Sequence, residues 1–296
     1  MRTVFRAGIF MGKKITIYEL LEAKQARRKI TAVSCYDYTT ASLAARAGVE
    51  MVLVGDSAAQ VVLGYDSTLP ATMDFMVELT AGVRRASQEF CLVADMPFLS
   101  YHTGLKDAVL NAGRFVSYAG AQIVKIEVSA AHLDVIRAVS DAGIAVMAHI
   151  GIRPQSITKL GRLKAEGTTA ELAYELLELS KAVANAGAGA VLLEGTAREV
   201  SAMITKELAV PVIGCGSGPD CDGQILVIAD LLGLSEAAKP KFAKSYAALA
   251  EQVVDALSRY AKEVREGVFP NDAQCYHIKA GQMDRLRQIR SAGQQQ

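Results

Sequence analysis

The sequence predicts an α/β protein, a closed (β/α)₈ barrel followed by a C-terminal helical extension. The first observation behind this prediction is a phrase that recurs along the chain. A helix-like segment ends in Ala-Gly and a short apolar run follows, at 46–56, 118–127, 141–151 and 185–195. Glycine just past a helix permits the left-handed conformation that closes the last turn. An unbroken apolar run is typical of a strand that is buried on both faces.

Other apolar runs complete a set of eight expected strands. They lie at 30–35, 90–95, 210–216 and, with a weaker pattern, 225–230. Helix-like stretches separate the strands, at 39–47, 74–87, 106–118, 130–142, 170–186 and 197–208. Strands that alternate with helices without a long linker predict a single domain built on a parallel sheet.

The second observation is where the acidic residues stand. Asp56, Asp95, Glu127 and Glu194 each come directly after an apolar run, at the C-terminal end of an expected strand. Barrel enzymes carry their chemistry at this end of the strands. The shared position therefore favours a closed barrel over an open sheet.

Three segments are expected along the chain. The barrel domain spans 15–278, an N-terminal extension covers 1–14, and a charged, Gln-rich tail covers 279–296, where we expect frayed ends. The amphipathic pattern after residue 235 predicts a helical extension that packs on the barrel or on a neighbouring subunit.

Composition excludes several classes of function. The formal net charge is +1, which gives no electrostatic reason to expect a nucleic acid or a membrane as partner. No apolar run approaches the roughly 20 residues that span a bilayer.

The five cysteines lack paired spacing, so a disulfide framework is not expected, and Cys35 and Cys91 are expected to be buried. The short apolar run at the N-terminus does not suit a signal peptide, and we expect a cytoplasmic protein.

Three of the strand-end carboxylates are candidate metal ligands. Burying an unpaired carboxylate is costly, so Asp56, Asp95 and Glu127 on neighbouring strands are poorly explained by packing. Hard oxygen ligands without Cys or His suit Mg²⁺, although other divalent cations are possible. The alternative is that each carboxylate only meets solvent or caps the next helix.

Glu194 is the candidate general base. It closes a strand further round the barrel, so it need not join the metal ligands. Its alternative role is a salt bridge to Arg198, four residues on.

Lys125 lies two residues before Glu127, so the two side chains point to the same side of a strand. A buried lysine needs an anionic partner, which is either a substrate carboxylate or one of the metal-binding carboxylates.

His149 ends another strand and is a weaker candidate for a role in the reaction, because a lone histidine there is more often structural. The Gly-rich segment 214–223 lacks the features of a P-loop and is expected to form a tight barrel loop.

Several motifs occur in an order that is more specific than any one of them. They are VGDS (54–57), GYDSTLPAT (64–72), ADMPF (94–98), VKIE (124–127), HIGIRPQS (149–156), the glutamate of LLEG (192–195), DGQILV (222–227) and PKFAK (240–244). Together they resemble the ketopantoate hydroxymethyltransferase family, from about residue 15 to 278.

The resemblance implies specific roles. It implies a Mg²⁺ site at Asp56, Asp95 and Glu127, and a site for 3-methyl-2-oxobutanoate at Asp56, Ser57, Asp95 and Lys125. It implies that Glu194 is the proton acceptor.

The resemblance also implies a (β/α)₈ TIM barrel of the phosphoenolpyruvate mutase/isocitrate lyase-like type and a large homo-oligomer, a decamer. The co-substrate would be 5,10-methylenetetrahydrofolate, the product 2-dehydropantoate, and the pathway pantothenate and coenzyme A synthesis.

The chain departs from the family pattern near the proposed site. Ala58-Ala59-Gln60 replaces Leu-Gly-Met, Thr196-Ala197-Arg198 replaces a segment that contains Val-Pro, Ala165-Glu166 replaces Val-Gln, and Ser217 replaces Ala. No departure removes a proposed ligand or the base, but the first stands beside Ser57 and could reshape the substrate pocket.

Two alternatives stay open. One is a related barrel lyase that cleaves a carbon–carbon bond of a 2-oxo acid, although the Lys-Cys-Gly-His-type loop of those lyases does not occur in the chain. The other is a protein that binds a 2-oxo acid without turnover.

Overall fold

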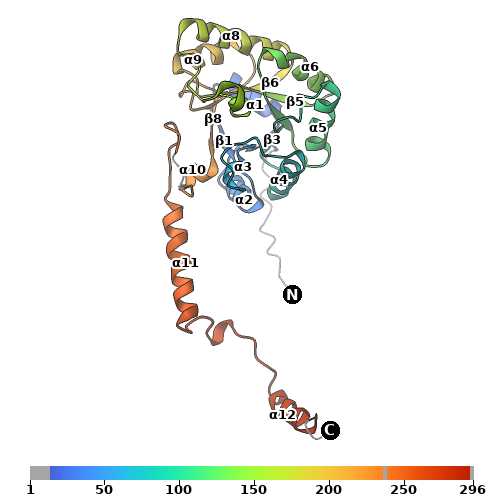
Figure 1. Ribbon diagram of the computed structural model, residues 1–296, viewed down its shortest axis with the longest axis vertical. Coiled ribbons are helices and arrows are strands. Elements are labelled where there is room, and N and C mark those ends of the chain that lie inside the picture. The colour runs from blue at the N-terminus through green and yellow to red at the C-terminus, as the bar shows by residue number, and fades with distance from the viewer. Residues whose placement is uncertain (1–13, 236–238, 294–296) are drawn as a thin grey trace. The chain divides into compact units, whose positions relative to one another are not determined.

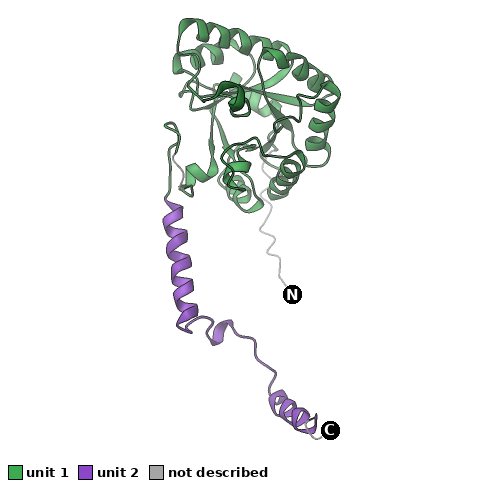
Figure 2. Ribbon diagram, viewed as in Figure 1, with its two compact units in different colours: residues 1–247 green, residues 248–296 purple. Residues whose placement is uncertain are grey.

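The computed structural model describes residues 14–235 and 239–293. Of the expected N-terminal extension, all but Lys14 lies outside the described residues. The chain divides into two compact units, residues 1–247 and 248–296, which are coloured separately in Figure 2. The first unit contains the barrel and every candidate site residue.

The described chain forms a closed parallel barrel, as predicted (Figure 1). Its strands pair in sequence order and β1 pairs with β8, so the barrel has no free edge. The strands are β1 (Ile30–Ser34), β2 (Met51–Val54), β3 (Cys91–Asp95), β4 (Ile123–Glu127), β5 (Ala145–Gly151), β6 (Ala188–Glu194), β7 (Val212–Cys215) and β8 (Gly223–Val227).

Helices form at each of the six stretches where the sequence predicts them, and further short helices that it does not predict also occur. Those of the first unit are α1 (Ile17–Gln25), α2 (Tyr38–Arg46), α3 (Ala58–Val61), α4 (Met73–Ala86), α5 (Leu105–Ser117), α6 (Leu133–Asp141), α7 (Ile157–Leu160), α8 (Ala170–Asn185), α9 (Arg198–Glu207) and α10 (Ile228–Leu232). Two short 3₁₀ helices are η1 (Ala130–His132) and η2 (Pro154–Ser156). The expected segment 130–142 corresponds to η1 and α6 together.

The eighth strand is shifted from its predicted range. It begins at Gly223 and ends at Val227, and the rest of the apolar run forms α10. A Cβ at Gly223 would lie 2.7 Å from the carbonyl oxygen of Ile30, so only glycine allows β8 to approach β1 this closely. Gly233, in the left-handed conformation, ends α10.

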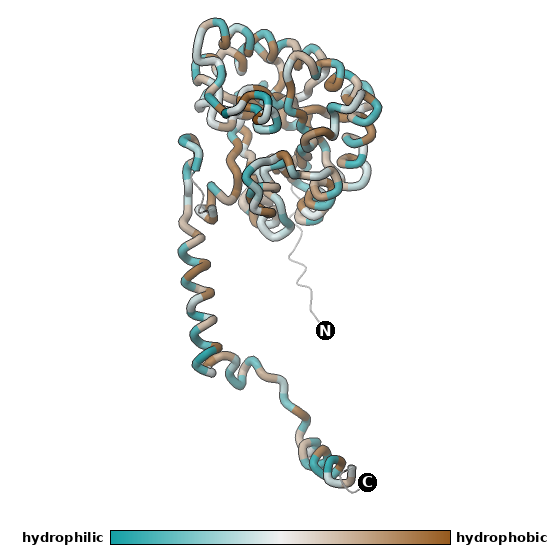
Figure 3. The backbone as a smooth tube through the Cα atoms, viewed as in Figure 1, coloured by the Kyte–Doolittle hydropathy of each residue, from teal (hydrophilic) through white to brown (hydrophobic). Residues whose placement is uncertain are grey.

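Alternating strand residues form two cores, and the barrel strands are apolar throughout most of their length (Figure 3). One core fills the barrel and the other lies between the strands and the helices. Inward-facing side chains include Ile30, Met51, Leu53, Cys91, Val93, Ile123, Met147, Leu192, Ile213 and Ile225. Cys35 and Cys91 are buried, as predicted, and all five cysteines are free thiols.

Helix α1 closes the end of the barrel opposite the predicted site. Leu20 and Ala23 are buried and belong to the core inside the barrel. Lys24 donates a hydrogen bond of 2.7 Å to Asp222, just before β8 begins. The N-terminal ends of the strands are therefore covered, and the C-terminal rim is left for chemistry.

The second unit contains α11 (Leu249–Arg265), the 3₁₀ helix η3 (Asp272–Gln274) and α12 (Gln282–Gly293). The predicted amphipathic helix is present as α11, but it begins only at Leu249, because the described residues 239–248 are not helical. All residues of α11 are at least partly exposed. The expectation of a frayed end after residue 280 is wrong for the described residues, because they form α12. Among the described helices, none has both the length and the apolar character that a membrane span requires.

Candidate active site

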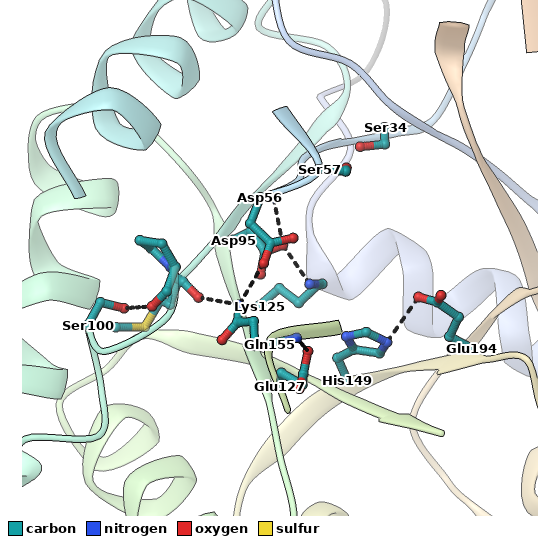
Figure 4. A network of polar contacts seen from close by, with 12 residues as sticks. Ser34, Asp56, Ser57, Asp95, Ser100, Lys125, Glu127, His149, Gln155 and Glu194 are labelled. Carbon is teal, nitrogen blue, oxygen red and sulfur yellow. Dashed lines mark hydrogen bonds and ion pairs between the residues drawn. The ribbon is translucent and has the colours of Figure 1, made fainter. Parts of the chain in front are cut away.

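The predicted polar residues meet at the C-terminal rim of the barrel (Figure 4). Parallel register sets their neighbours: Asp95 of β3 lies beside Lys125 of β4, and Glu127 of β4 lies beside His149 of β5. On the next pair of strands, Gly151 of β5 lies beside Glu194 of β6. The sheet thus places an acidic or basic side chain at or near the end of each strand from β3 to β6.

Asp95 is the centre of a buried charge cluster. Its Oδ2 atom accepts a hydrogen bond of 3.0 Å from the backbone N–H of Asp56 and one of 2.6 Å from Lys125 Nζ. Asp56, Asp95 and Lys125 are 6%, 1% and 5% exposed. Of the partners considered for Lys125, the structure shows the ion pair with a proposed metal ligand.

The charges of this cluster depend on one another. Burial raises the pKa of Asp95, and the ammonium group of Lys125 acts against that increase. Burial lowers the pKa of Lys125, but the negative charges of Asp95 and Asp56 outweigh it and raise the pKa overall. Because the two groups are 2.6 Å apart, the pair is best described as carboxylate and ammonium.

Gln155, on η2, connects the acidic residues. Its Nε2 atom donates hydrogen bonds to Asp56 Oδ2 at 2.9 Å and to the carbonyl oxygen of Met96 at 3.1 Å. Its Oε1 atom accepts one of 2.7 Å from the hydroxyl of Tyr101. Gln155 is 3% exposed, so every polar atom of its amide is used inside the protein.

Both carboxylate oxygens of Glu127 already have donors. The backbone N–H of Gln155 donates to Oε2 at 2.9 Å, and the hydroxyl of Ser156 donates to Oε1 at 3.0 Å. The loop that follows β5 therefore fixes the orientation of Glu127.

The acidic residues fit a hard divalent cation in part. The Oδ1 atom of Asp95 is buried and has no hydrogen-bond partner in the described chain, which leaves it free to bind a cation. Asp56 is adjacent, whereas Glu127 is held by the loop after β5. Within the described ranges, no three acidic, histidine or cysteine side chains form a ready-made metal cluster. Mg²⁺ commonly takes one or two carboxylates and keeps its waters, which this arrangement allows.

Ser57 belongs to a row of hydroxyl groups on the other side of Asp56. Tyr36 and Ser57 share a hydrogen bond of 2.8 Å, and Ser34 donates one of 3.2 Å to Tyr36. Burial raises the pKa of Tyr36 to about 12, so its hydroxyl stays protonated near neutral pH. A Cβ at Gly55 would lie 3.0 Å from the hydroxyl oxygens of Ser34 and Ser57, so this glycine lets the row form.

Glu194 faces His149. The two side chains approach to 3.3 Å between Oε2 and Nε2, yet neither ring nitrogen has a hydrogen-bond partner among the described residues. The side chain of Glu194 is 22% exposed and that of His149 is 2% exposed. The alternative salt bridge to Arg198 does not form, because Arg198 Nε lies 2.9 Å from Asp220 Oδ2.

The backbone beneath Glu194 is tightly packed. Gly151 has a φ of +91°, and a Cβ there would lie 2.2 Å from the carbonyl oxygen of Glu194. Ser217 accepts a hydrogen bond of 3.1 Å from the N–H of Thr196 and donates one of 2.7 Å to the carbonyl oxygen of Leu193. Two departures from the family pattern, Thr196 and Ser217, are thus direct partners.

The Gly-rich segment 214–223 forms the tight loop that the sequence predicts. Gly216 has a φ of +67°, and a Cβ there would lie 2.3 Å from a ring carbon of Phe242. The backbone at this position is therefore covered by a side chain.

Comparison with known proteins identifies the family. Residues 14–272 match the family model described as ketopantoate hydroxymethyltransferase.

The chain belongs to the ketopantoate hydroxymethyltransferase family.

Similar family members span nearly the whole chain. A 3-methyl-2-oxobutanoate hydroxymethyltransferase of Pelobacter propionicus is 47% identical over 90% of this chain and 99% of its own. One of Hyperthermus butylicus is also 47% identical, over 94% and 96% of the two chains. One of Syntrophomonas wolfei is 44% identical, over 92% and 99%.

Solved structures support the fold. A 2,3-dimethylmalate lyase, described as a member of the PEP mutase/isocitrate lyase superfamily, has a TM-score of 0.58 at 18% identity. It covers 96% of this chain and 98% of its own. A phosphonopyruvate hydrolase complex with oxalate and Mg²⁺ has a TM-score of 0.57 at 15% identity, with coverage of 94% and 99%. These similarities agree with the barrel type that the family resemblance implies.

Several residues that contact the candidate active site have no role that the sequence predicts. Gln155 and Ser156 lie in one of the motifs that carry the resemblance, but no role follows for them from the sequence. Tyr36 and Tyr101 stand after strand ends in apolar surroundings, where a tyrosine is commonly a packing residue. A signal was present in the motif HIGIRPQS, because a polar Gln-Ser pair follows a strand end there.

Proposed function

We propose that this protein transfers a one-carbon unit from 5,10-methylenetetrahydrofolate to C3 of 3-methyl-2-oxobutanoate. Water is consumed, and the products are 2-dehydropantoate and tetrahydrofolate. The names of the relatives support this reaction. The observation that carries the mechanism is the rim itself, where Glu194 stands apart from the paired carboxylates of β2 to β4.

Glu194 would take the proton from C3 of the 2-oxo acid. Its carboxylate reaches the open rim and does not pair with Arg198, so it can contact a substrate. His149, 3.3 Å away, can exchange hydrogen bonds with Glu194 as the proton arrives and leaves. Water would release the methylene group from both folate nitrogens as formaldehyde, leaving tetrahydrofolate. The deprotonated C3 would then form a bond to the carbon of formaldehyde, whose oxygen takes up a proton and becomes the new hydroxyl group.

Asp56 and Asp95 are the residues that would hold Mg²⁺ directly. The ion would supply Lewis-acid chemistry at the 2-oxo group of the substrate. Glu127 completes the predicted set of ligands, and both of its carboxylate oxygens also accept a hydrogen bond from the loop after β5.

Lys125 and Ser57 would bind the substrate. Lys125 brings a buried positive charge to the rim, and this charge can offset the substrate carboxylate and the charge that develops on its oxo group. Ser57 can donate a hydrogen bond, because its partner Tyr36 is itself both donor and acceptor.

The wider setting follows from the same reaction. We place it in pantothenate synthesis, and hence coenzyme A synthesis, in the cytoplasm. A homo-oligomer, a decamer by family resemblance, is supported by an apolar stripe on α11, where Val253, Leu257, Tyr260 and Val264 are 46–60% exposed. Sedimentation velocity should give a mass several times that of one chain, and a monomer would contradict this part of the proposal.

The reaction is tested by product formation. Purified protein with Mg²⁺ and 3-methyl-2-oxobutanoate should form 2-dehydropantoate only when 5,10-methylenetetrahydrofolate is added. Without the folate, it should still exchange the C3 proton in D₂O. Carbon–carbon cleavage that needs no folate would favour the lyase. Binding of the 2-oxo acid by calorimetry, with neither exchange nor product, would favour the inactive protein.

A further inference from the structure

The long loop between β5 and α8 lines a second pocket, which is open to solvent, at the rim. Its volume is about 180 Å³, smaller than the roughly 300–1,000 Å³ of pockets that enclose a whole drug-sized ligand. It therefore suits one end of a larger molecule. The pocket is lined by Ile152, Arg153, Leu160, Arg162, Leu163, Lys164 and Glu166.

This pocket begins where the strand of the proposed base ends. The backbone N–H of Ile152 donates to the carbonyl oxygen of Glu194 at 2.9 Å, and that of Glu166 donates to Gly195 at 3.0 Å. A Cβ at Gly195 would lie 2.2 Å from a side-chain carbon of Ile152. Two walls of the pocket are thus attached to Glu194 and Gly195, and a ligand could reach from one site to the other.

The pocket has an excess of positive charge. Arg153, Arg162 and Lys164 line it together with a single carboxylate, that of Glu166. Within the described chain, none of the three basic residues forms a salt bridge, whereas Arg198 on α9 pairs with Asp220 at 2.9 Å. Basic groups gathered without acidic partners favour an anionic ligand.

The apolar residues narrow the choice of ligand. Ile152, Leu160 and Leu163 provide apolar surface beside the basic groups, which suits a ligand whose apolar stem ends in carboxylates. The folate co-substrate has this chemistry at one end, since its aminobenzoyl ring carries a glutamate with two carboxylates. Its reactive end is the pterin, which must reach the carbon next to Glu194.

We propose that Arg153, Arg162 and Lys164 bind the glutamate carboxylates of the folate co-substrate. This inference rests on the proposed function. It assigns the folate tail to the loop after β5 and leaves the rim of β2 to β4 for the 2-oxo acid. Since Arg162 and Lys164 are exposed, replacing them should change binding without disturbing the barrel core.

The test compares ligands with and without the glutamate. Calorimetry would measure the Kd of tetrahydrofolate and of tetrahydropteroate, which lacks the glutamate, for native protein and for Arg162→Gln/Lys164→Gln. In the native protein, loss of the glutamate should weaken binding about tenfold, or about 1.4 kcal/mol. The variant should bind both ligands equally weakly, while its KM for 3-methyl-2-oxobutanoate and its C3 exchange rate stay native.

A matched control removes two exposed charges elsewhere. Arg85 and Lys206 lie in the last turns of α4 and α9, at the end of the barrel away from the rim. Arg85→Gln/Lys206→Gln should retain the tenfold preference for tetrahydrofolate. The inference is wrong if the pocket variant keeps that preference or if the control loses it equally. Absence of C3 exchange and product in the native protein would instead refute the proposed function.

Discussion

The rim of the barrel has two halves that differ in how their polar groups are held. In the acidic half, formed by Asp56, Asp95, Lys125 and Glu127, nearly every polar atom has a partner from another strand or from Gln155. In the base half, formed by His149 and Glu194, the main side-chain contact is the one between these two residues, with 3.3 Å between His149 Nε2 and Glu194 Oε2.

Burial sets Glu194 apart from the other rim residues, because His149 is as buried as the acidic half. The residues of the acidic half are 1–6% exposed, whereas the side chain of Glu194 is 22% exposed. Groups that hold a charge in place benefit from fixed partners, since an environment organised in advance does not reorganise during reaction. A group that accepts a proton from a substrate must keep a free oxygen. The difference therefore separates binding from proton transfer.

The largest effect should come from the base half. Glu194→Gln keeps the size of the side chain and removes its ability to accept a proton. We expect the C3 exchange of 3-methyl-2-oxobutanoate in D₂O, followed by NMR, to fall about 10²–10⁴-fold, as is usual for loss of a general base. Unfolding temperature should stay close to native, because glutamine has the same size and can still contact His149. Unchanged exchange would exclude Glu194 as the base and remove the contrast between the halves.

The next effect tests charge pairing in the acidic half. Asp95→Asn leaves Lys125, which is 5% exposed, without a carboxylate partner. We expect the free energy of unfolding to fall by about 3–5 kcal/mol, the usual cost of breaking a buried ion pair. Denaturant titration measures this loss, and activity at any Mg²⁺ concentration should be strongly reduced.

A second substitution separates stability from function. Asp95→Asn/Lys125→Met removes both charges and should recover most of the lost stability, but no activity. If the double variant is as unstable as the single one, the destabilisation does not come from an unpaired lysine.

A smaller effect is expected from Gln155, the positioning residue of the acidic half. Gln155→Leu removes the donors to Asp56 and Met96 and leaves buried groups unsatisfied, at a cost of about 1–3 kcal/mol. Because Asp56 loses its orientation, more Mg²⁺ should be needed for half-maximal rate, while the KM for the folate stays native. Gln224→Leu is the control, since this exposed amide donates only to the carbonyl oxygen of Gly218. Equal Mg²⁺ dependence in both variants would show that Gln155 is only structural.

Most of the fold was predictable because each strand is a buried apolar run. The shift of β8 shows the limit. The apolar run from Ile225 to Ala229 suits a strand throughout, but Gly223 and Gly233 set where the strand begins and the helix ends. Those limits depend on close contact with Ile30 and on a left-handed cap, and neither contact can be read from apolar periodicity.

Most of the site residues, like most of the fold, were predictable from the sequence. Asp56, Asp95, Glu127 and Glu194 were found because a carboxylate at a strand end is unusual, and the parallel register brings such ends together. Gln155 was not found, because it lies in a loop and its bond to Asp56 joins residues 99 positions apart. Metal binding and the role of each residue stay predictions.

Gly151 limits how this active site can be altered. Because glycine has no Cβ, the backbones of β5 and β6 can pack closely beside Glu194; any Cβ at Gly151 would collide with the carbonyl oxygen of Glu194. A substitution there would displace the base and the adjoining wall of the second pocket together. Libraries intended to widen substrate range should vary the residues around Ser57 and keep this glycine constant.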